Sequence, residues 1–441
     1  MKDKTMEIFA TASVPKAVIS NVIPSIVSML MVLIYNLADT FFISVSSGAD
    51  GITVLNLALP IYGLIFAIGA MLGIGSATRY AILKAQQNKD ADNYLFSGII
   101  WICIVSIPFV LVGLISPESL LRIMGGDNEI VAIGREYFHL FVTFAPAFML
   151  NNLFQAFVRN DGDPTRAMCA TVAGSIFNII FDYIFMFPMK MGLTGAALAT
   201  SISPLIGIVI SATHFLTNRN TLKIKVKPPS VKRLFHSCQL GVSAFVAEIS
   251  SAVITTVFNF LLLGLVGKIA VAAYGVIANL ALVSVAIFNG ISQGMQPLIS
   301  EYYGGGKVLE VKKLLKMGFI TAAISSILII VAAYAFTDSF IAVFNSEGSK
   351  ELAYYAHHGL RIYFLGYVFA GFNIVATGYL SSVARAKEAF VASVLRGFIA
   401  ILACAIVLSS LFGIAGVWMS FPLAEGISSL IIIVFMVKYR V

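Results

Sequence analysis

Apolar and polar positions follow one another along the 441-residue chain in long blocks. Each apolar block holds about the 20 residues that a helix needs to cross a bilayer. The blocks lack the ten-residue alternation typical of membrane β-strands, so we expect helices, which satisfy their backbone groups internally. Twelve spans are predicted at residues 15–42, 52–79, 94–116, 130–157, 167–188, 192–216, 237–266, 269–300, 316–337, 352–381, 388–410 and 413–437.

The composition agrees with this pattern. Hydrophobic residues make up 59% of the chain and charged residues 11%, whereas soluble domains carry about 25% charge. The mean hydropathy is +0.94. The sequence therefore predicts an all-α, multi-pass membrane protein.

Basic residues gather in alternate connections between the predicted spans. The segment 219–234 alone holds six lysines and arginines, and the connections after even-numbered spans are also basic. By the positive-inside rule, these connections and both chain termini are expected in the cytoplasm. The net charge of +8 thus reflects membrane orientation, and we expect no nucleic-acid partner.

The two halves of the chain resemble each other. Residues 192–205 match residues 413–426, and Arg135–Phe138 match Arg361–Phe364, with an offset that stays between 217 and 226. Six spans per half give both halves the same topology, related by an axis along the membrane normal. We expect an N-terminal six-helix bundle (1–218), a basic cytoplasmic linker (219–234) and a C-terminal six-helix bundle (235–441).

Asp182 lies inside the fifth predicted span, with Asn178 four residues before it. Residues four apart share one face of a helix, so both side chains should point into one site. A carboxylate at that depth costs about 2.5–3.5 kcal/mol and is functional by default. At the repeat offset Asn178, Asp182 and Thr200 correspond to apolar residues, which predicts a polar site in the N-terminal half alone.

Other polar residues are weaker candidates. Arg396 and Glu425 in the last two spans have uncharged counterparts in the first half, and we expect a buried ion pair that neutralises itself. Glu248 is a secondary candidate for cation coupling. Several aromatic, amide and methionine side chains are candidates to line an adaptable substrate cavity. These are Tyr35, Asn36, Asn151, Asn152, Gln155, Met295 and Gln296.

Enzyme and metal motifs are not found. Gly304–Lys307 lacks the Ser or Thr of a phosphate loop, and no protease, hydrolase, haem or metal spacing occurs. We expect no catalytic residue, no bound metal and no cofactor, with H⁺ or Na⁺ as the coupling ion.

Five segments carry a resemblance to a known family. They are NLADTFFIS, FVRNDGDPTRAM, NIIFD, GLTGAALAT and GISQGMQPLISEYYGGGK, spread over nearly the whole chain. The chain resembles the multidrug and toxic compound extrusion (MATE) transporters, in the DinF/MepA branch. The resemblance implies a V-shaped pair of six-helix bundles that exports organic cations in exchange for H⁺ or Na⁺. It places the N-terminal polar site at Asp39, Asn178, Asp182 and Thr200, and it matches Glu248 to a glutamate of other members.

These expectations define a secondary active multidrug exporter of the bacterial plasma (inner) membrane. Its partners would be organic cationic or amphipathic drugs and the lipid bilayer, and it would act as a monomer. The alternative is a flippase for lipid-linked oligosaccharides with a related two-bundle architecture. That cavity should be basic to bind pyrophosphate, whereas acids are found here.

Overall fold

The computed structural model describes residues 14–345 and 348–438, and no β-strand occurs among them. The first half contains α2 (Val14–Ala85), η1 (Ala91–Asn93), α3 (Tyr94–Ile115), α4 (Pro117–Ile123), α5 (Asn128–Thr143), α6 (Ala145–Asn160), α7 (Pro164–Met186), α8 (Gly192–Ala212) and η2 (Thr213–Leu216). The second half contains α9 (Val231–Leu265), α10 (Lys268–Gly304), α11 (Val308–Ala335), α12 (Thr337–Phe344), α13 (Lys350–Phe364), α14 (Tyr367–Ser382), α15 (Ala386–Val394), η3 (Leu395–Ala400) and α16 (Ile401–Lys438). Both ends of the chain lie outside the described residues.

The helices account for twelve membrane spans. Eight helices are long and apolar enough to cross a bilayer, and two bent pairs, α5 with α6 and α13 with α14, raise the number to ten. Two of these ten, the 72-residue α2 and the 53-residue run from α15 to α16, are too long for one crossing. Each breaks at a glycine with positive φ, Gly48 (59°) or Gly413 (57°), and supplies two spans. The described residues therefore hold the twelve predicted spans.

Corresponding breaks occur in the two halves. Gly48 and Gly267 separate the first two spans of each half, and Gly192 and Gly413 begin the last span of each. All four have φ between 53° and 108°, a region that glycine enters without the steric cost of a side chain. The bent pairs also correspond, with bends of 40° in the first half and 47° in the second. This pattern agrees with the repeat read from the sequence.

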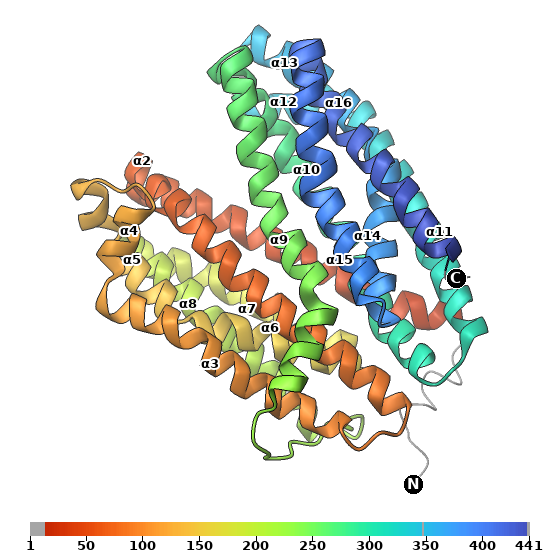
Figure 1. Ribbon diagram of the computed structural model, residues 1–441. Helices are drawn as coiled ribbons and strands as arrows, with labels where there is room; N and C mark the ends of the chain where they lie inside the picture. The colour runs from red at the N-terminus through yellow and green to blue at the C-terminus, as the bar shows by residue number, and fades with distance from the viewer. Residues whose placement is uncertain (1–13, 346–347, 439–441) are drawn as a thin grey trace.

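The two bundles meet at one end and diverge toward the other, as Figure 1 shows. The first turns of α2 reach into the core of the second half, where Ala17, Val18 and Val22 pack. In return, Leu234 and Cys238 near the start of α9 pack on the core of the first half. The first helix of each half thus crosses toward the other bundle at the end where they meet.

Glycines allow the helices of the two halves to touch closely at this end. A Cβ on Gly75 would overlap the Ser237 carbonyl oxygen, and a Cβ on Gly241 would overlap that of Met71. Gly290 and Gly294 of α10 also bring α2 near, with an added Cβ only 2.6 Å from the Cα of Ile26 or Val22. We call these two contacts, α2 with α9 and α2 with α10, the junction.

The structure differs from the sequence prediction at several boundaries. Predicted spans 130–157 and 352–381 were single helices, but each is broken, at Phe144 and at Leu365–Gly366. Pro146 explains the first break because its ring is accepted in the first turn of a helix but not inside one. Helices α9 and α11 also begin at Val231 and Val308, several residues before the predicted 237 and 316. Their first turns are charged and extend beyond the apolar stretch.

The junction generates the first prediction. In a variant with Ser76→Cys and Ser237→Cys, a disulfide should form readily because the two hydroxyl oxygens are 2.9 Å apart. Adding Gly241→Val should suppress it, since the new side chain meets backbone and overpacking costs about 1–3 kcal/mol. Non-reducing electrophoresis after cleavage of the linker measures the crosslink. Gly264→Val is the control because an added Cβ there meets nothing within 4 Å. Equal crosslinking in both glycine variants would contradict the junction.

Candidate functional site

Three helices of the first bundle bring the predicted polar residues together. Asp39 lies on α2, Asn178 and Asp182 on α7, and Thr200 on α8. Asn178 and Asp182 are 0% exposed, and Thr200 and Asp39 are 5% and 7% exposed. Asp182 lies within electrostatic range of Asp39. We call these four residues the acid site.

Asn178 links the acid site by hydrogen bonds. With its amide nitrogen facing Asp182, it donates to Oδ2 at 3.1 Å. Its oxygen then accepts from the Thr200 backbone nitrogen at 3.3 Å and from the Thr200 hydroxyl at 3.1 Å. This orientation satisfies both the nitrogen and the oxygen of the Asn178 amide, which is how an amide is assigned. The contact between Asn178 and Asp182 is the one that their four-residue spacing predicted.

The acids themselves are incompletely satisfied. Asp39 Oδ1 and Asp182 Oδ1 are buried without a hydrogen-bond partner. Within the described ranges, no lysine, arginine or histidine comes within 4.0 Å of either carboxyl group. Burying an uncompensated charge costs several kcal/mol, so the site favours a bound proton or small cation. The carboxyl, amide and hydroxyl oxygens are hard donors that suit Na⁺ as well as H⁺.

Tyrosines surround the acid site. The Tyr35 hydroxyl, one turn before Asp39, lies 2.8 Å from the Tyr62 hydroxyl. Tyr62 in turn stacks on Phe66, with ring centroids 4.3 Å apart. Tyr137 of α5 also lies within electrostatic range of Asp39 and Asp182. The sequence prediction included Tyr35 and missed Tyr62 and Tyr137.

A signal for Tyr137 was present in the repeat. It belongs to the Arg135–Phe138 motif, whose counterpart in the second half contains Tyr363. Tyr363 lies within electrostatic range of Glu425 and Arg396. In each half the tyrosine of this motif thus lies within electrostatic range of a buried acid. No comparable signal distinguishes Tyr62 from the 16 tyrosines of the chain.

The remaining cavity candidates occupy several places. Gln155 donates to Asn151 at 2.9 Å and accepts from Thr171 at 2.8 Å, which ties α6 to α7. Asn152 packs against Gly69 and Gly73 of α2. The Asn36 carbonyl accepts from Thr40.

Two of the candidates are buried in this conformation. Met295 is 1% exposed, in the core of the second half. Gln296 donates to Thr78 at 2.8 Å and to Asn160 at 3.0 Å across the junction. Neither side chain is open to a substrate here.

Glu248 is exposed on α9 and has no hydrogen bond or ion pair with any residue that the structure describes. It is therefore not part of the acid site. Its role as a secondary coupling residue stays a prediction.

The second bundle holds a different kind of acid. Glu425 of α16 accepts from Arg396 Nε at 2.6 Å and from Asn373 Nδ2 at 2.7 Å. Ser429 completes the cluster by donating to Asn373 at 2.9 Å. Arg396 lies in η3, a π-helical turn that interrupts the eleventh span. The predicted ion pair is confirmed. Arg396 neutralises Glu425, whereas Asp39 and Asp182 of the first bundle have no basic partner among the described residues.

A cluster of charged residues lies at the junction end of the first bundle. Asp161, between α6 and α7, accepts from Tyr80 and Lys84 at 2.8 Å each, and from Thr221 of the linker. His214 of η2 lies between Asp161 (2.8 Å) and Asp163 (3.3 Å). Burial alone would raise the pKa of Asp161, but the hydrogen bonds from His214 and Lys84 and the charge of Lys84 lower it to about 2. The cluster ties the linker to three helices, and the sequence prediction did not include it.

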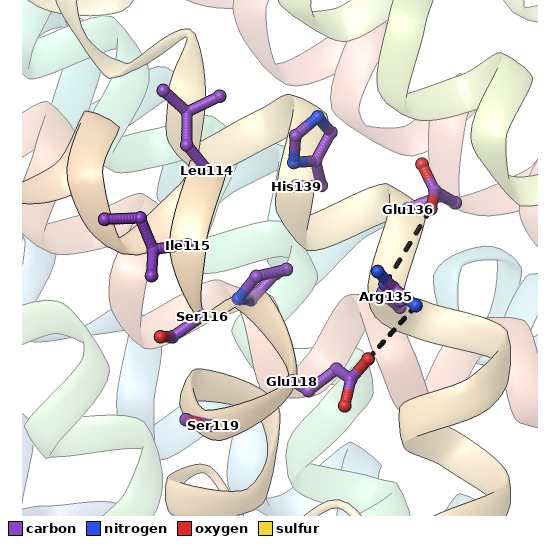
Figure 2. Close-up of a pocket in the computed structure, with 9 residues that line it drawn as sticks. Leu114, Ile115, Ser116, Glu118, Ser119, Arg135, Glu136 and His139 are labelled. Carbon is purple, nitrogen blue, oxygen red and sulfur yellow. Dashed lines mark ion pairs between the residues drawn. The ribbon is translucent and has the colours of Figure 1, made fainter.

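A pocket of about 280 Å³ lies at the opposite end of the first bundle, between the end of α3 and α5. Figure 2 shows Arg135 beside Glu118 (3.2 Å) and Glu136 (4.0 Å), with His139 one turn further along the same helix. The side chains of both ion pairs are about half exposed, and such pairs contribute at most about 1 kcal/mol. The pocket is separate from the acid site and carries no functional assignment.

The twelve spans form two related bundles, and one bundle contains two buried acids without a basic partner among the described residues. These features define a membrane transporter of the two-bundle class. The MatE family model matches residues 24–184 and 244–406, once in each half. The chain belongs to the MatE family of membrane transporters.

Similar proteins support the same placement. The chain is 25% identical to the multidrug export protein MepA of Staphylococcus saprophyticus over 445 residues, covering 100% of this chain and 98% of that protein. It is 24% identical to MepA of Staphylococcus aureus, with the same coverage. A solved structure described as the outward-facing conformation of a multidrug resistance MATE family transporter matches with a TM-score of 0.90 at 21% identity, covering 97% of this chain and 96% of that one. A transporter from Pyrococcus furiosus matches with a TM-score of 0.89, also at 21% identity and with the same coverage.

The charged cluster around Asp161 generates the second prediction. Asp161→Asn should lower the free energy of unfolding by about 3–5 kcal/mol, because Lys84 and His214 lose their buried acceptor. The folded pKa of Asp161 lies below its unfolded value, so its contribution is present above about pH 4 and is lost as the pH falls toward 2. Thermal melting in detergent at pH 7 and pH 3 measures both effects. Asp50→Asn, an exposed acid, is the control, and equal melting of the two variants at pH 7 would contradict the assignment.

The ion pair in the second bundle generates the third prediction. Arg396→Gln should destabilise the protein by about 3–5 kcal/mol, because it leaves Glu425 buried without its cation. Combining it with Glu425→Gln should restore most of that loss, since the glutamine still accepts from Asn373. Melting of the single and double variants gives the coupling energy. Additive losses would show that the two groups do not act as a pair.

Proposed function

We propose that the protein is a secondary active multidrug exporter, which exchanges organic cations or amphipathic drugs for H⁺ or Na⁺ by alternating access. The observation that carries the proposal is the acid site, where Asp39 and Asp182 are buried together without a cation from the protein. Two such groups cannot both stay ionised cheaply when they are near each other. A cation from solution must relieve that charge.

The acid site gives a reason for exchange. A proton or Na⁺ at Asp182 removes the charge, so the buried site is then stable without a substrate. An organic cation near Asp39 stabilises the ionised form, which favours release of the bound proton or Na⁺. Binding of one cation therefore opposes binding of the other, and this competition is the basis of antiport.

The junction supports alternating access. Its polar contacts include neutral hydrogen bonds between Ser76 and Ser237 (2.9 Å) and between Gln296 and Thr78 (2.8 Å). Such bonds contribute only about 1 kcal/mol each, because water replaces them when they open. Two rigid bundles joined by glycine contacts and weak polar bonds suit rocking of one half against the other.

The orientation follows from charge. The basic linker lies at the junction end, so by the positive-inside rule this end would face the cytoplasm of a bacterial plasma membrane. The bundles would then diverge toward the outside, consistent with the outward-facing transporter to which the fold is similar. One chain carries both halves, which supports a monomer as the working unit.

The chemistry of the acid site disfavours a flippase for lipid-linked oligosaccharides. A pyrophosphate group needs cationic partners, and the acid site offers carboxyl, amide and hydroxyl groups instead. No observation on the described residues favours the flippase over the exporter.

Asp182→Asn generates the fourth prediction. It should abolish efflux of a cationic dye from everted membrane vesicles, because the neutral amide no longer binds the coupling cation. A pH gradient and a Na⁺ gradient, imposed separately, identify which ion drives efflux by the wild type.

Two further variants serve as comparisons. Asp50→Asn removes an exposed acid and should leave efflux unchanged at equal expression, while Glu248→Gln should have a milder effect than Asp182→Asn. Normal efflux by Asp182→Asn would refute the coupling role. Complete loss in Glu248→Gln alone would place coupling in the second bundle.

A further inference from the structure

A groove of about 460 Å³ runs along the outside of the second bundle, between the first half of α11 and the last turns of α16. The start of α11 and the end of α16 both lie at the junction end of the molecule. Figure 1 shows the C-terminal end of α16 beside α11. The residues that line the groove are Lys312, Leu315, Lys316, Phe319, Ile320, Ala323 and Met436.

The groove is cationic at one end and apolar along the rest. Lys312 and Lys316 are four residues apart, so they share the face of α11 that carries Ile320 and Ala323 one and two turns further along. Leu315 is buried at 6% exposure beneath them, while Ile320 is 48% exposed. Charge therefore lies near the start of the helix and apolar surface lies deeper in the span.

The two lysines have no hydrogen-bond or ion-pair partner among the described residues. Neither forms a hydrogen bond or an ion pair with a residue in the ranges 14–345 and 348–438. Lys316 lies two turns inside α11, roughly 12 Å from its first residue at 1.5 Å per residue. A lysine at that depth directs its ammonium group toward the lipid headgroups. Two such groups above an apolar groove are complementary to a negative headgroup that carries an acyl chain.

We propose that this groove binds one anionic phospholipid. The phosphate lies on Lys312 and Lys316, and an acyl chain follows Phe319, Ile320 and Ala323 toward the middle of the bilayer. Met436 of α16 forms the opposite wall. Basic pockets between helices at the cytoplasmic surface are suited to anionic headgroups because that leaflet is negatively charged. The inference depends on the membrane-spanning fold and not on the transported substrate.

The test uses the full-length protein in detergent, titrated with phosphatidylglycerol or phosphatidylcholine and followed by native mass spectrometry. The wild type should retain one phosphatidylglycerol in preference to phosphatidylcholine. Lys312→Gln with Lys316→Gln should weaken phosphatidylglycerol binding about 25-fold, since each lysine near an anionic lipid surface contributes about fivefold. Phosphatidylcholine binding should change little.

Lys313→Gln is the matched control, because Lys313 is an exposed lysine of the same helix that does not line the groove. It should bind phosphatidylglycerol as the wild type does. Ala323→Trp fills the apolar part and keeps both lysines, and it should weaken binding of the intact lipid. Circular dichroism confirms that each variant is folded.

Three results would overturn the proposal. The first is unchanged phosphatidylglycerol preference in the double lysine variant. The second is an equal loss in Lys313→Gln, which would indicate non-specific charge attraction. The third is full competition by glycerophosphoglycerol, the headgroup without acyl chains, which would show that the apolar groove takes no part. Co-purification of a protein on this face in place of lipid would also count against it.

Discussion

The structure depends on two carboxyl groups, Asp39 and Asp182, that share a buried site with no positive side chain from the protein. A charge removed from water must be neutralised, and in the function proposed above that task falls to an ion from outside the protein. The helices around the site are arranged for this. Asn178 is hydrogen-bonded to Asp182, and Thr200 is hydrogen-bonded to Asn178, so these groups are held in place relative to one another. A self-neutralised site would have no reason to exchange ions.

The second bundle shows the contrast within the same molecule. It repeats the topology, the positive-φ glycines and the bent span of the first bundle. Its buried acid, Glu425, is however paired with Arg396 at 2.6 Å. The guanidinium of Arg396 serves as the counter-ion of Glu425 in this structure. Equivalent architecture thus surrounds two kinds of buried acid: a pair without a basic partner among the described residues, and one that is paired with an arginine.

The junction connects this chemistry to motion. Close glycine contacts between α2 and α9, and between α2 and α10, let the bundles meet along backbone. The polar bonds there are mostly between neutral groups, so separation exposes few unpaired charges. By contrast, Asp161, Lys84 and His214 bind the linker and the helix ends of the first bundle with charged hydrogen bonds. Charged contacts thus gather around the linker, where Arg233 of α9 also pairs with Asp90 at 3.0 Å, while α2 meets α9 and α10 through glycines and neutral polar groups.

The sequence by itself determined the number of spans, the repeat and the face shared by Asn178 and Asp182, because hydrophobicity and helical periodicity are local properties. It also indicated the pairing of Arg396 with Glu425, since the residues at the corresponding positions of the first half are uncharged. It placed neither the breaks at Phe144 and Gly366 nor the charged first turns of α9 and α11, because a helix continues past the apolar stretch when neighbours support it. Only the tertiary structure brought Tyr62 and Tyr137 to the acid site, buried Met295 in a core, and formed the Asp161 cluster. Those contacts join helices far apart in the chain, and packing rather than periodicity decides them.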